Sequence, residues 1–198
     1  MNSMFRRVWL LALLLSSATA ANAALELSLG SRQSAAVLSV SIAISGLEAG
    51  IAPALSAYDL DLYFDASRLA YLDTVVGDGQ LGDELDVFDA GNNLISASLS
   101  QPGRLNLFEL SFDDPADLNA LQADTFRLAL VNFVVLQAGE TTLDLTINAL
   151  ADADGEALSA SPASLTVAAV PLPPSLVMMA TGLMLLYTRR RERGRQPA

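Results

Sequence analysis

Residues 58–64 read YDLDLYF, and this stretch decides the fold class. Apolar positions alternate with polar ones: Tyr58, Leu60, Leu62 and Phe64 on one side, Asp59, Asp61 and Tyr63 on the other. A period of two residues places successive side chains on opposite faces of an extended chain. The stretch therefore predicts a β-strand with one face in a core and the other in water.

Similar segments recur along the chain. Alternation is clear over residues 39–44, 142–147 and 165–167, and further strands are expected over 25–29, 69–76, 93–99, 104–112 and 125–136. Glycine and proline separate these segments, and no internal repeat is present. Nine short strands at this spacing predict an all-β fold, a single nine-stranded sandwich of jelly-roll type over residues 24–169.

Local departures from this pattern predict smaller features. The apolar positions change phase within residues 104–112 and again within 125–136, which indicates a β-bulge or a strand that bends between sheets. The second segment could instead be a strand buried on both faces. One helical turn is expected over residues 117–121, capped by Asp114 or Asp117, and a tight turn at Asp154-Gly155.

One stretch carries a resemblance to a known family. Residues 58–69, YDLDLYFDASRL, resemble the strand–turn–strand centre of cohesin-like modules, in which an apolar strand ends in an aromatic residue and an aspartate. The likeness extends best over residues 36–76. It implies a nine-stranded sandwich of about this length that binds proteins or glycans and does not catalyse a reaction.

The N-terminus has the form of a secretory signal peptide over residues 1–23. Arg6 and Arg7 precede the apolar run VWLLALLL, and Ala21-Asn22-Ala23 supplies the small residues that signal peptidase requires. The mature chain is expected to begin at Ala24 and to be exported through the inner membrane. An uncleaved anchor helix is the alternative.

The C-terminal segment, residues 170–198, has the form of a membrane-halting tail. It reads VPLPPSLVMMATGLMLLYTRRRERGRQPA. Residues 170–188 carry no charge and would span roughly 28 Å as a helix, which is just enough for one short transmembrane helix. The arginines that follow favour the cytoplasmic side. The alternative is a final core strand followed by a basic tail.

The tail also resembles the PEP-CTERM sorting signal of Gram-negative bacteria, in its VPLP form. The matching residues are Val170, Pro171, Pro173, Gly182, Arg189, Arg190 and Arg191. Leu172 stands where the acidic residue between the prolines would be. The resemblance implies processing by an exosortase-type enzyme, brief residence in the inner membrane, and a final place at the cell surface or in an extracellular matrix of exopolysaccharide and biofilm.

Composition excludes several kinds of chemistry. The chain has no cysteine and no histidine, so Ser-His-Asp triads, Cys-His pairs and zinc sites of the usual kind are absent. Residues 24–169 hold four arginines against 21 acidic residues, a net charge of −17, which disfavours nucleic acid and anionic lipid as partners. We expect a protein that is not an enzyme and needs no cofactor.

Calcium is the one ion that the acidic loops suggest. Asp152, Asp154 and Glu156 alternate around a glycine turn and form a candidate calcium site, since calcium prefers hard oxygen ligands. A second acidic loop holds Asp78, Asp83, Glu84 and Asp86. Solvated turns are the alternative for both loops.

These features together predict an exported, non-enzymatic surface or extracellular-matrix protein, processed at its tail and associated with exopolysaccharide or biofilm. One alternative is a glycan- or protein-binding module tethered to the membrane, with exopolysaccharide or another surface protein as its partner. A second alternative is a carboxylate-dependent hydrolase, because 21 acidic residues offer many pairs.

Overall fold

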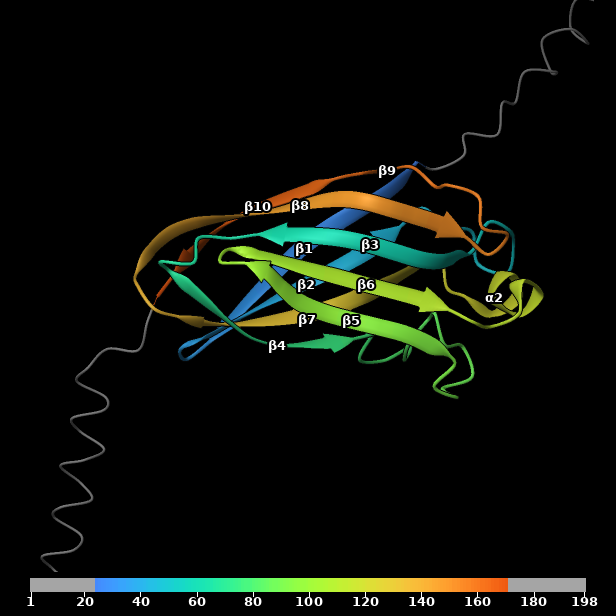
Figure 1. Ribbon diagram of the computed structural model, residues 1–198, viewed down its shortest axis with the longest axis horizontal. Coiled ribbons are helices and arrows are strands. Elements are labelled where there is room, and N and C mark those ends of the chain that lie inside the picture. The colour runs from blue at the N-terminus through green and yellow to red at the C-terminus, as the bar shows by residue number, and fades with distance from the viewer. Residues whose placement is uncertain (1–23, 171–198) are drawn as a thin grey trace, which may run out of the picture.

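Two β-sheets packed face to face make up the part of the chain that the computed structural model describes, residues 24–170 (Figure 1). In chain order the elements are β1 (Leu25–Ser34), β2 (Val37–Ser45), β3 (Leu55–Tyr63), β4 (Leu69–Val76), β5 (Asn93–Gln101), β6 (Arg104–Ser111), α2 (Pro115–Leu121), β7 (Thr125–Val135), β8 (Gly139–Asp152), β9 (Ala160–Ser161) and β10 (Ala163–Ala169). The predicted all-β class is confirmed.

Each sheet has five strands. One, called the β2 sheet below, has the order β4-β7-β2-β1-β9, and the other, the β3 sheet, has the order β10-β8-β3-β6-β5. All strand pairs are antiparallel except β1 with β9. β3 lies at the centre of its sheet, between β8 and β6.

The core lies between the sheets and is built from the inward side chains of both. Leu60 and Leu62 of β3 are fully buried, as are Val40 and Ile42 of β2. The Phe133 ring of β7 lies 4.8 Å from the ring of Phe64, centroid to centroid, in a tilted arrangement. Because the chain has no cysteine, this apolar contact between the sheets replaces any disulfide framework.

Residues 24–170 form ten strands, so the predicted count of nine is wrong. The additional strand is β9, which has only two residues and pairs in parallel with Leu25 and Glu26. A two-residue strand has no room to show alternation, and residues 159–164 are rich in serine and alanine.

One of the two predicted bulges is present. In β7 the register against β2 shifts between Ile42 and Ala43, where Leu128 is the extra residue. In β6 the prediction is wrong, because Leu105, Leu107 and Glu109 keep a regular alternation into the core. The phase change in the sequence instead reflects apolar residues on the outer face of β6.

The predicted helical turn is confirmed as α2, with Asp114 as its N-cap. The Asp114 carboxylate accepts a hydrogen bond from the Ala116 N–H at 2.9 Å. Gln122, which follows α2, is 4% exposed and pairs with both backbone groups of Leu55, at 2.6 and 2.8 Å. Its side-chain amide also donates to the Glu84 carbonyl, so one polar side chain joins α2, β3 and the acidic loop.

Among residues 24–170, no helix has the length and apolar character needed to cross a membrane. The predicted signal peptide and transmembrane helix lie outside the described residues, and both stay predictions. Ala24 and Val170, the first and last described residues, lie at opposite ends of the sandwich (Figure 1).

We predict that Gln122→Ala lowers the free energy of unfolding by about 2–4 kcal/mol, because it leaves buried backbone groups of Leu55 and Glu84 without partners. Urea titration followed by circular dichroism measures the change. Gln137→Ala, at an exposed position, is the control and should change stability by less than about 0.5 kcal/mol. Equal effects of the two substitutions would contradict the role of Gln122.

Candidate functional site

The outer face of the β3 sheet presents side chains in rows that cross its strands. The row nearest α2 is apolar and consists of Leu94 of β5, Leu110 of β6, Ala57 of β3 and Ala151 of β8. The next row contains Phe108 between Ser96 and Asp59. Leu94 is 53% exposed, whereas Phe108 and Leu110 are half-buried. The first row and the adjacent Phe108 are together called the apolar row below; its members are Leu94, Ala57, Phe108, Leu110 and Ala151.

Beyond the apolar row, five polar side chains form a hydrogen-bonded network, called the polar cluster below. They are Asp59, Asp61, Arg104, Asn106 and Asn148. The Asn106 amide donates to Asp59 at 2.7 Å, and the Asn148 amide donates to Asp59 at 3.0 Å and to Asp61 at 2.7 Å. Arg104 forms an ion pair with Asp61 at 2.6 Å. Three strands, β3, β6 and β8, thus supply one connected network.

A β-bulge places Asn148 in this network. The register between β3 and β8 shifts where Asp59 pairs with Ala149 and Leu60 pairs with Ile147. Asn148 is the extra residue between them, and its side chain reaches both aspartates. Bulges are typical places where a sheet redirects a side chain.

Hydrogen bonds and the charge of Arg104 favour the ionised form of Asp61. Asp61 is only 1% exposed, and the hydrogen bond from the Arg104 guanidinium, helped by those from Asn148 and Asn106, holds the pKa of its carboxyl below the ordinary value. The same guanidinium lies 5.6 Å from the centre of the Tyr63 ring. The cluster therefore presents hydrogen-bonding groups whose positions are set before any ligand arrives.

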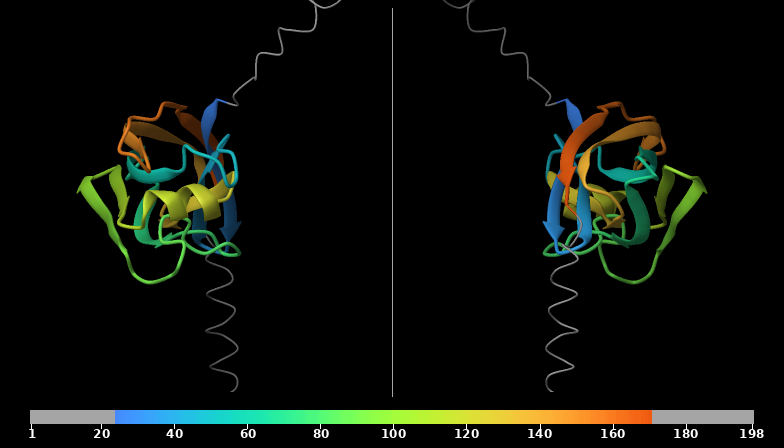
Figure 2. Two further views of the ribbon diagram at one scale, coloured as in Figure 1. Left: turned by 90° about the vertical axis from the view of Figure 1, so that its right-hand side faces the viewer. Right: turned by 90° about the vertical axis from the view of Figure 1, so that its left-hand side faces the viewer.

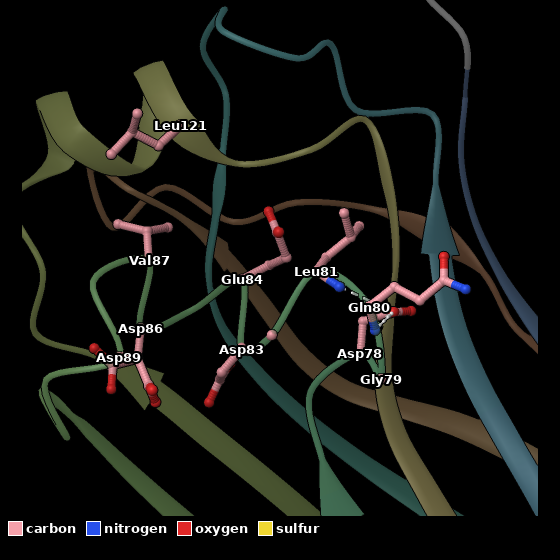
Figure 3. A pocket seen from close by; sticks show the side chains of 11 residues that line it. Asp78, Gly79, Gln80, Leu81, Asp83, Glu84, Asp86, Val87, Asp89 and Leu121 are labelled. Atoms are coloured by element: carbon pink, nitrogen blue, oxygen red, sulfur yellow. Dashed lines mark hydrogen bonds between the residues drawn. The ribbon is translucent and has the colours of Figure 1, made fainter.

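The acidic loop, residues 77–92, uses its carboxylates to hold its own backbone (Figure 3). Asp78 accepts from the N–H groups of Gln80 and Leu81, and Asp86 accepts from those of Ala90 and Gly91. Glu84 accepts from the backbone N–H of Ala123 at 2.7 Å. These carboxylates order the loop and its hollow beside α2, and they are not simply solvated.

On the core side of the β3 sheet, a fourth carboxylate of this loop, Asp83, lies close to the buried Glu109. The Asn93 amide donates to both Asp83 and Glu109 at 2.8 Å, and Glu109 is 1% exposed. Burial, together with the negative charge of Asp83, raises the pKa of Glu109 to about 8. Glu109 Oε2 has no hydrogen-bond partner within residues 24–170, which fits a protonated acid facing the Asp83 carboxylate.

The candidate calcium residues Asp152, Asp154 and Glu156 lie at the end of β8 and in the turn that follows. Asp152 Oδ1 accepts from the backbone N–H groups of Asp154 and Glu156, at 3.0 and 2.8 Å, so this carboxylate stabilises the tight turn predicted at Gly155. Within the described part of the chain, no three acidic side chains are grouped closely enough to hold a metal ion. Calcium binding stays a prediction.

The residues predicted for export and sorting fall mostly outside the described part of the chain. Ala24 and Val170 are its first and last residues, and the N–H of Val170 donates to the Gln33 side chain. Ala21, Ala23, Pro171, Pro173, Gly182, Arg189, Arg190 and Arg191 lie beyond those limits.

Sequence reasoning did not find the outer-face site. The alternation of β3 marked Asp59 and Asp61 as outward-facing residues, but Arg104, Asn106 and Asn148 come from strands far away in the sequence. The change of phase of the apolar positions in residues 104–112 is the one sign of the apolar row in the sequence. It indicates outward-facing apolar residues only if β6 is known to continue without a bulge.

Comparisons with known proteins identify the fold. No family model and no curated relative matches the chain. Among solved structures, a non-cellulosomal cohesin from the archaeon Archaeoglobus fulgidus has a TM-score of 0.53 at 18% identity, covering 75% of this chain and 92% of that one. The sixth cohesin of Acetivibrio cellulolyticus scaffoldin B, solved with a Cel5 dockerin, has a TM-score of 0.54 at 16% identity, covering 76% and 99%.

A third similar structure is the cohesin module of a family 33 glycoside hydrolase from Clostridium perfringens, with a TM-score of 0.54 at 10% identity, covering 74% of this chain and 96% of that module. At these identities the likeness establishes the fold. The expected cohesin-like sandwich is confirmed.

We predict that Glu109 makes folding stability fall as pH rises. The folded protein keeps a proton on Glu109 up to about pH 8, whereas the unfolded chain releases it near its ordinary pKa of 4.5. The contribution of Glu109 is therefore fully present below pH 4.5 and lost as pH rises through 8. Between pH 5 and 9 the wild type should lose on the order of 2–4 kcal/mol more than Glu109→Gln.

Urea titrations at a series of pH values measure this difference. Glu140→Gln, which changes an exposed glutamate on β8, should keep the wild-type pH dependence. If Glu109→Gln also keeps it, Glu109 is ionised in the folded protein and the proposed proton is absent.

Proposed function

We propose that this chain is an exported, non-catalytic binding module that recognises a protein partner through the outer face of the β3 sheet. The observation that carries the proposal is the placement of the apolar row beside the polar cluster on one face. Protein interfaces typically combine a desolvated apolar centre with surrounding polar groups. This face offers both without rearrangement.

The rigidity of the polar cluster favours binding. Asp59, Asp61, Asn106 and Arg104 restrain one another through hydrogen bonds, so little side-chain freedom remains to be lost on association. A partner that offers apolar side chains to Phe108 and Leu94, with donors for Asp59 and acceptors for Arg104, would match the face. A segment of a protein can supply apolar side chains, hydrogen-bond donors and hydrogen-bond acceptors together.

Catalysis fits the same residues poorly. A general acid needs a proton near neutral pH, but Arg104 keeps the pKa of Asp61 low. Glu109 does carry a raised pKa, yet it is buried and faces the core side of β6 rather than the open face. The two carboxyl groups thus lie on opposite sides of the sheet.

A protein partner is favoured over a glycan by the aromatic content. The only tryptophan is Trp9, outside the sandwich, and the aromatic rings beside the apolar row and the polar cluster are Phe108, which is half-buried, and Tyr63, which lies against Arg104. The similar Acetivibrio cohesin was solved in complex with a dockerin, which supports a protein partner by analogy of fold.

We further propose that the sequence features at both ends govern location. The signal peptide would direct export, and the VPLP tail would be removed by an exosortase-type enzyme, leaving the sandwich at the cell surface or in an exopolysaccharide matrix. Val170 begins this tail and is 58% exposed, so the chain leaves the sandwich at an accessible point. A persistent tail would instead make the protein a tethered module.

For the binding face, we predict that Phe108→Ser weakens binding of the partner by at least about tenfold, because it removes the largest apolar side chain of the apolar row. The partner is captured from the envelope of the native host, identified by mass spectrometry, and titrated by calorimetry. Leu130→Ser is the matched control, since Leu130 is also half-buried but faces outward from the β2 sheet.

The control should change the Kd by less than about twofold. Equal losses from both substitutions would place binding elsewhere. Sedimentation with exopolysaccharide of the same host separates a glycan ligand from a protein one, because retention on purified polymer alone would overturn the protein proposal.

For the tail, we predict a mature C-terminus near Pro171–Pro174. Intact-mass measurement of the protein recovered from its host, with peptide mapping of both ends, checks this. Recovery of a chain that still ends at Ala198 would contradict removal of the tail and leave the binding proposal standing.

A further inference from the structure

β5 is an open edge strand. It pairs with β6 on one side, and its other side ends the β3 sheet. All nine residues of β5 are exposed or half-buried, and the strand forms the outermost part of the sandwich on that side (Figure 2). Alternate backbone N–H and C=O groups along such an edge point toward solvent and can pair with another strand.

β5 lacks charge and proline, two of the usual protections of an edge strand, although its register against β6 shifts between Leu99 and Gln101. Its sequence, NLISASLSQ, has no charge and no proline, although the domain is densely acidic. The β4 edge of the other sheet carries Asp73 and a bulge, and β10, at the far edge of the β3 sheet, lies against β1. Apart from the two-residue β9, β5 is therefore the one edge strand of residues 24–170 that is both uncharged and uncovered.

The sequence of β5 is symmetric about its middle residue. Ile95-Ser96-Ala97-Ser98-Leu99 reads apolar–Ser–Ala–Ser–apolar in both directions. If β5 pairs antiparallel with a second β5 about a two-fold axis at Ala97, Ile95 lies opposite Leu99 of the other copy, and Ser96 lies opposite Ser98. Self-complementarity of this kind is what a two-fold interface requires.

The apolar residues of β5 also have surface left to bury. Ile95 is 44% exposed and Leu99 is 49% exposed, although their register with Glu109 and Leu105 turns them toward the core side. Two-fold pairing would bring two copies of Ile95 and two of Leu99 into direct cross-strand contact. Pairs of branched apolar residues across an antiparallel ladder stabilise it.

We propose that β5 is a self-association edge, at which a second copy of this chain adds its own β5 antiparallel to form a continuous ten-stranded sheet. The two-fold axis passes through Ala97. Such a dimer places two outer faces, each with its apolar row and polar cluster, side by side. The inference does not depend on the proposed partner, because the edge can pair whether or not the face binds a protein.

The net charge of the domain makes the proposed dimer dependent on salt concentration. Each domain carries a net charge of −17, so two copies repel, while the β5 edge itself is neutral. Salt screens the long-range repulsion and leaves backbone pairing and apolar contact almost unaffected. Association should therefore strengthen as ionic strength rises from roughly 50 to 500 mM.

Cross-linking of the full chain tests the two-fold axis directly. The natural sequence has no cysteine, so Ala97→Cys introduces its only thiol. Directly opposite Cβ atoms in an antiparallel pair lie about 5 Å apart, within reach of mild oxidation or a short bismaleimide. We expect a covalent dimer on a non-reducing gel, whereas Ser28→Cys, exposed on the outer face of β1, should remain monomeric.

A cysteine-free pair of variants keeps the test decisive if Ala97→Cys folds poorly. Ser96→Lys with Ser98→Lys sets like charges opposite each other across the proposed pair, whereas Ser28→Lys with Ser34→Lys adds the same charge on β1. Sedimentation equilibrium of the full chain in density-matched detergent should show the first variant at least about tenfold weaker in dimerisation and the second unchanged.

Equal cross-linking at residues 28 and 97 would overturn the proposal, as would dimerisation that survives the lysine pair on β5. A monomeric wild type at high salt would also overturn it. If the chains associate only through the tail, neither pair of lysine substitutions should change the dimerisation constant.

Discussion

Side-chain alternation along β3 connects the core of this protein to its outer surface. Leu60 and Leu62 point inward and are fully buried, while Asp59 and Asp61, one residue away, point outward and organise the polar cluster. A shift of one residue in this strand would exchange the two sets and place carboxylates in the core. Because the sandwich has no disulfide, the burial of these leucines fixes the register on which the outer face depends.

Acidic residues serve several physical roles here. Asp78 and Asp86 accept hydrogen bonds from the loop backbone, the hydrogen bond from Arg104 lowers the pKa of Asp61, and burial together with the charge of Asp83 raises the pKa of Glu109. The same residue type thus orders a loop, anchors a surface network and occupies the edge of the core. Net charge describes the long-range field of the domain and says little about any one of these carboxylates.

The sequence predicted the strands whose alternation is strong and the turn capped by Asp114, since both depend on local patterns. It missed β9, which is too short for a pattern, and it interpreted the outward Phe108 and Leu110 as a bulge. The polar cluster joins β3, β6 and β8, so its existence depends on register between strands some 45 and 87 residues apart. Sequence periodicity alone carries no information on that register.

The most direct test of the binding face is the response of its side-chain amides to the partner. In nuclear magnetic resonance spectra, the amide protons of Asn106 and Asn148 report on the polar cluster, and those of Asn132, which donates to Asp73 on the β2 sheet, provide an internal control. We expect addition of the partner to shift the Asn106 and Asn148 signals and to leave the Asn132 signals unchanged. Shifts at Asn132 with Asn106 and Asn148 unaffected would contradict binding through the outer face of the β3 sheet.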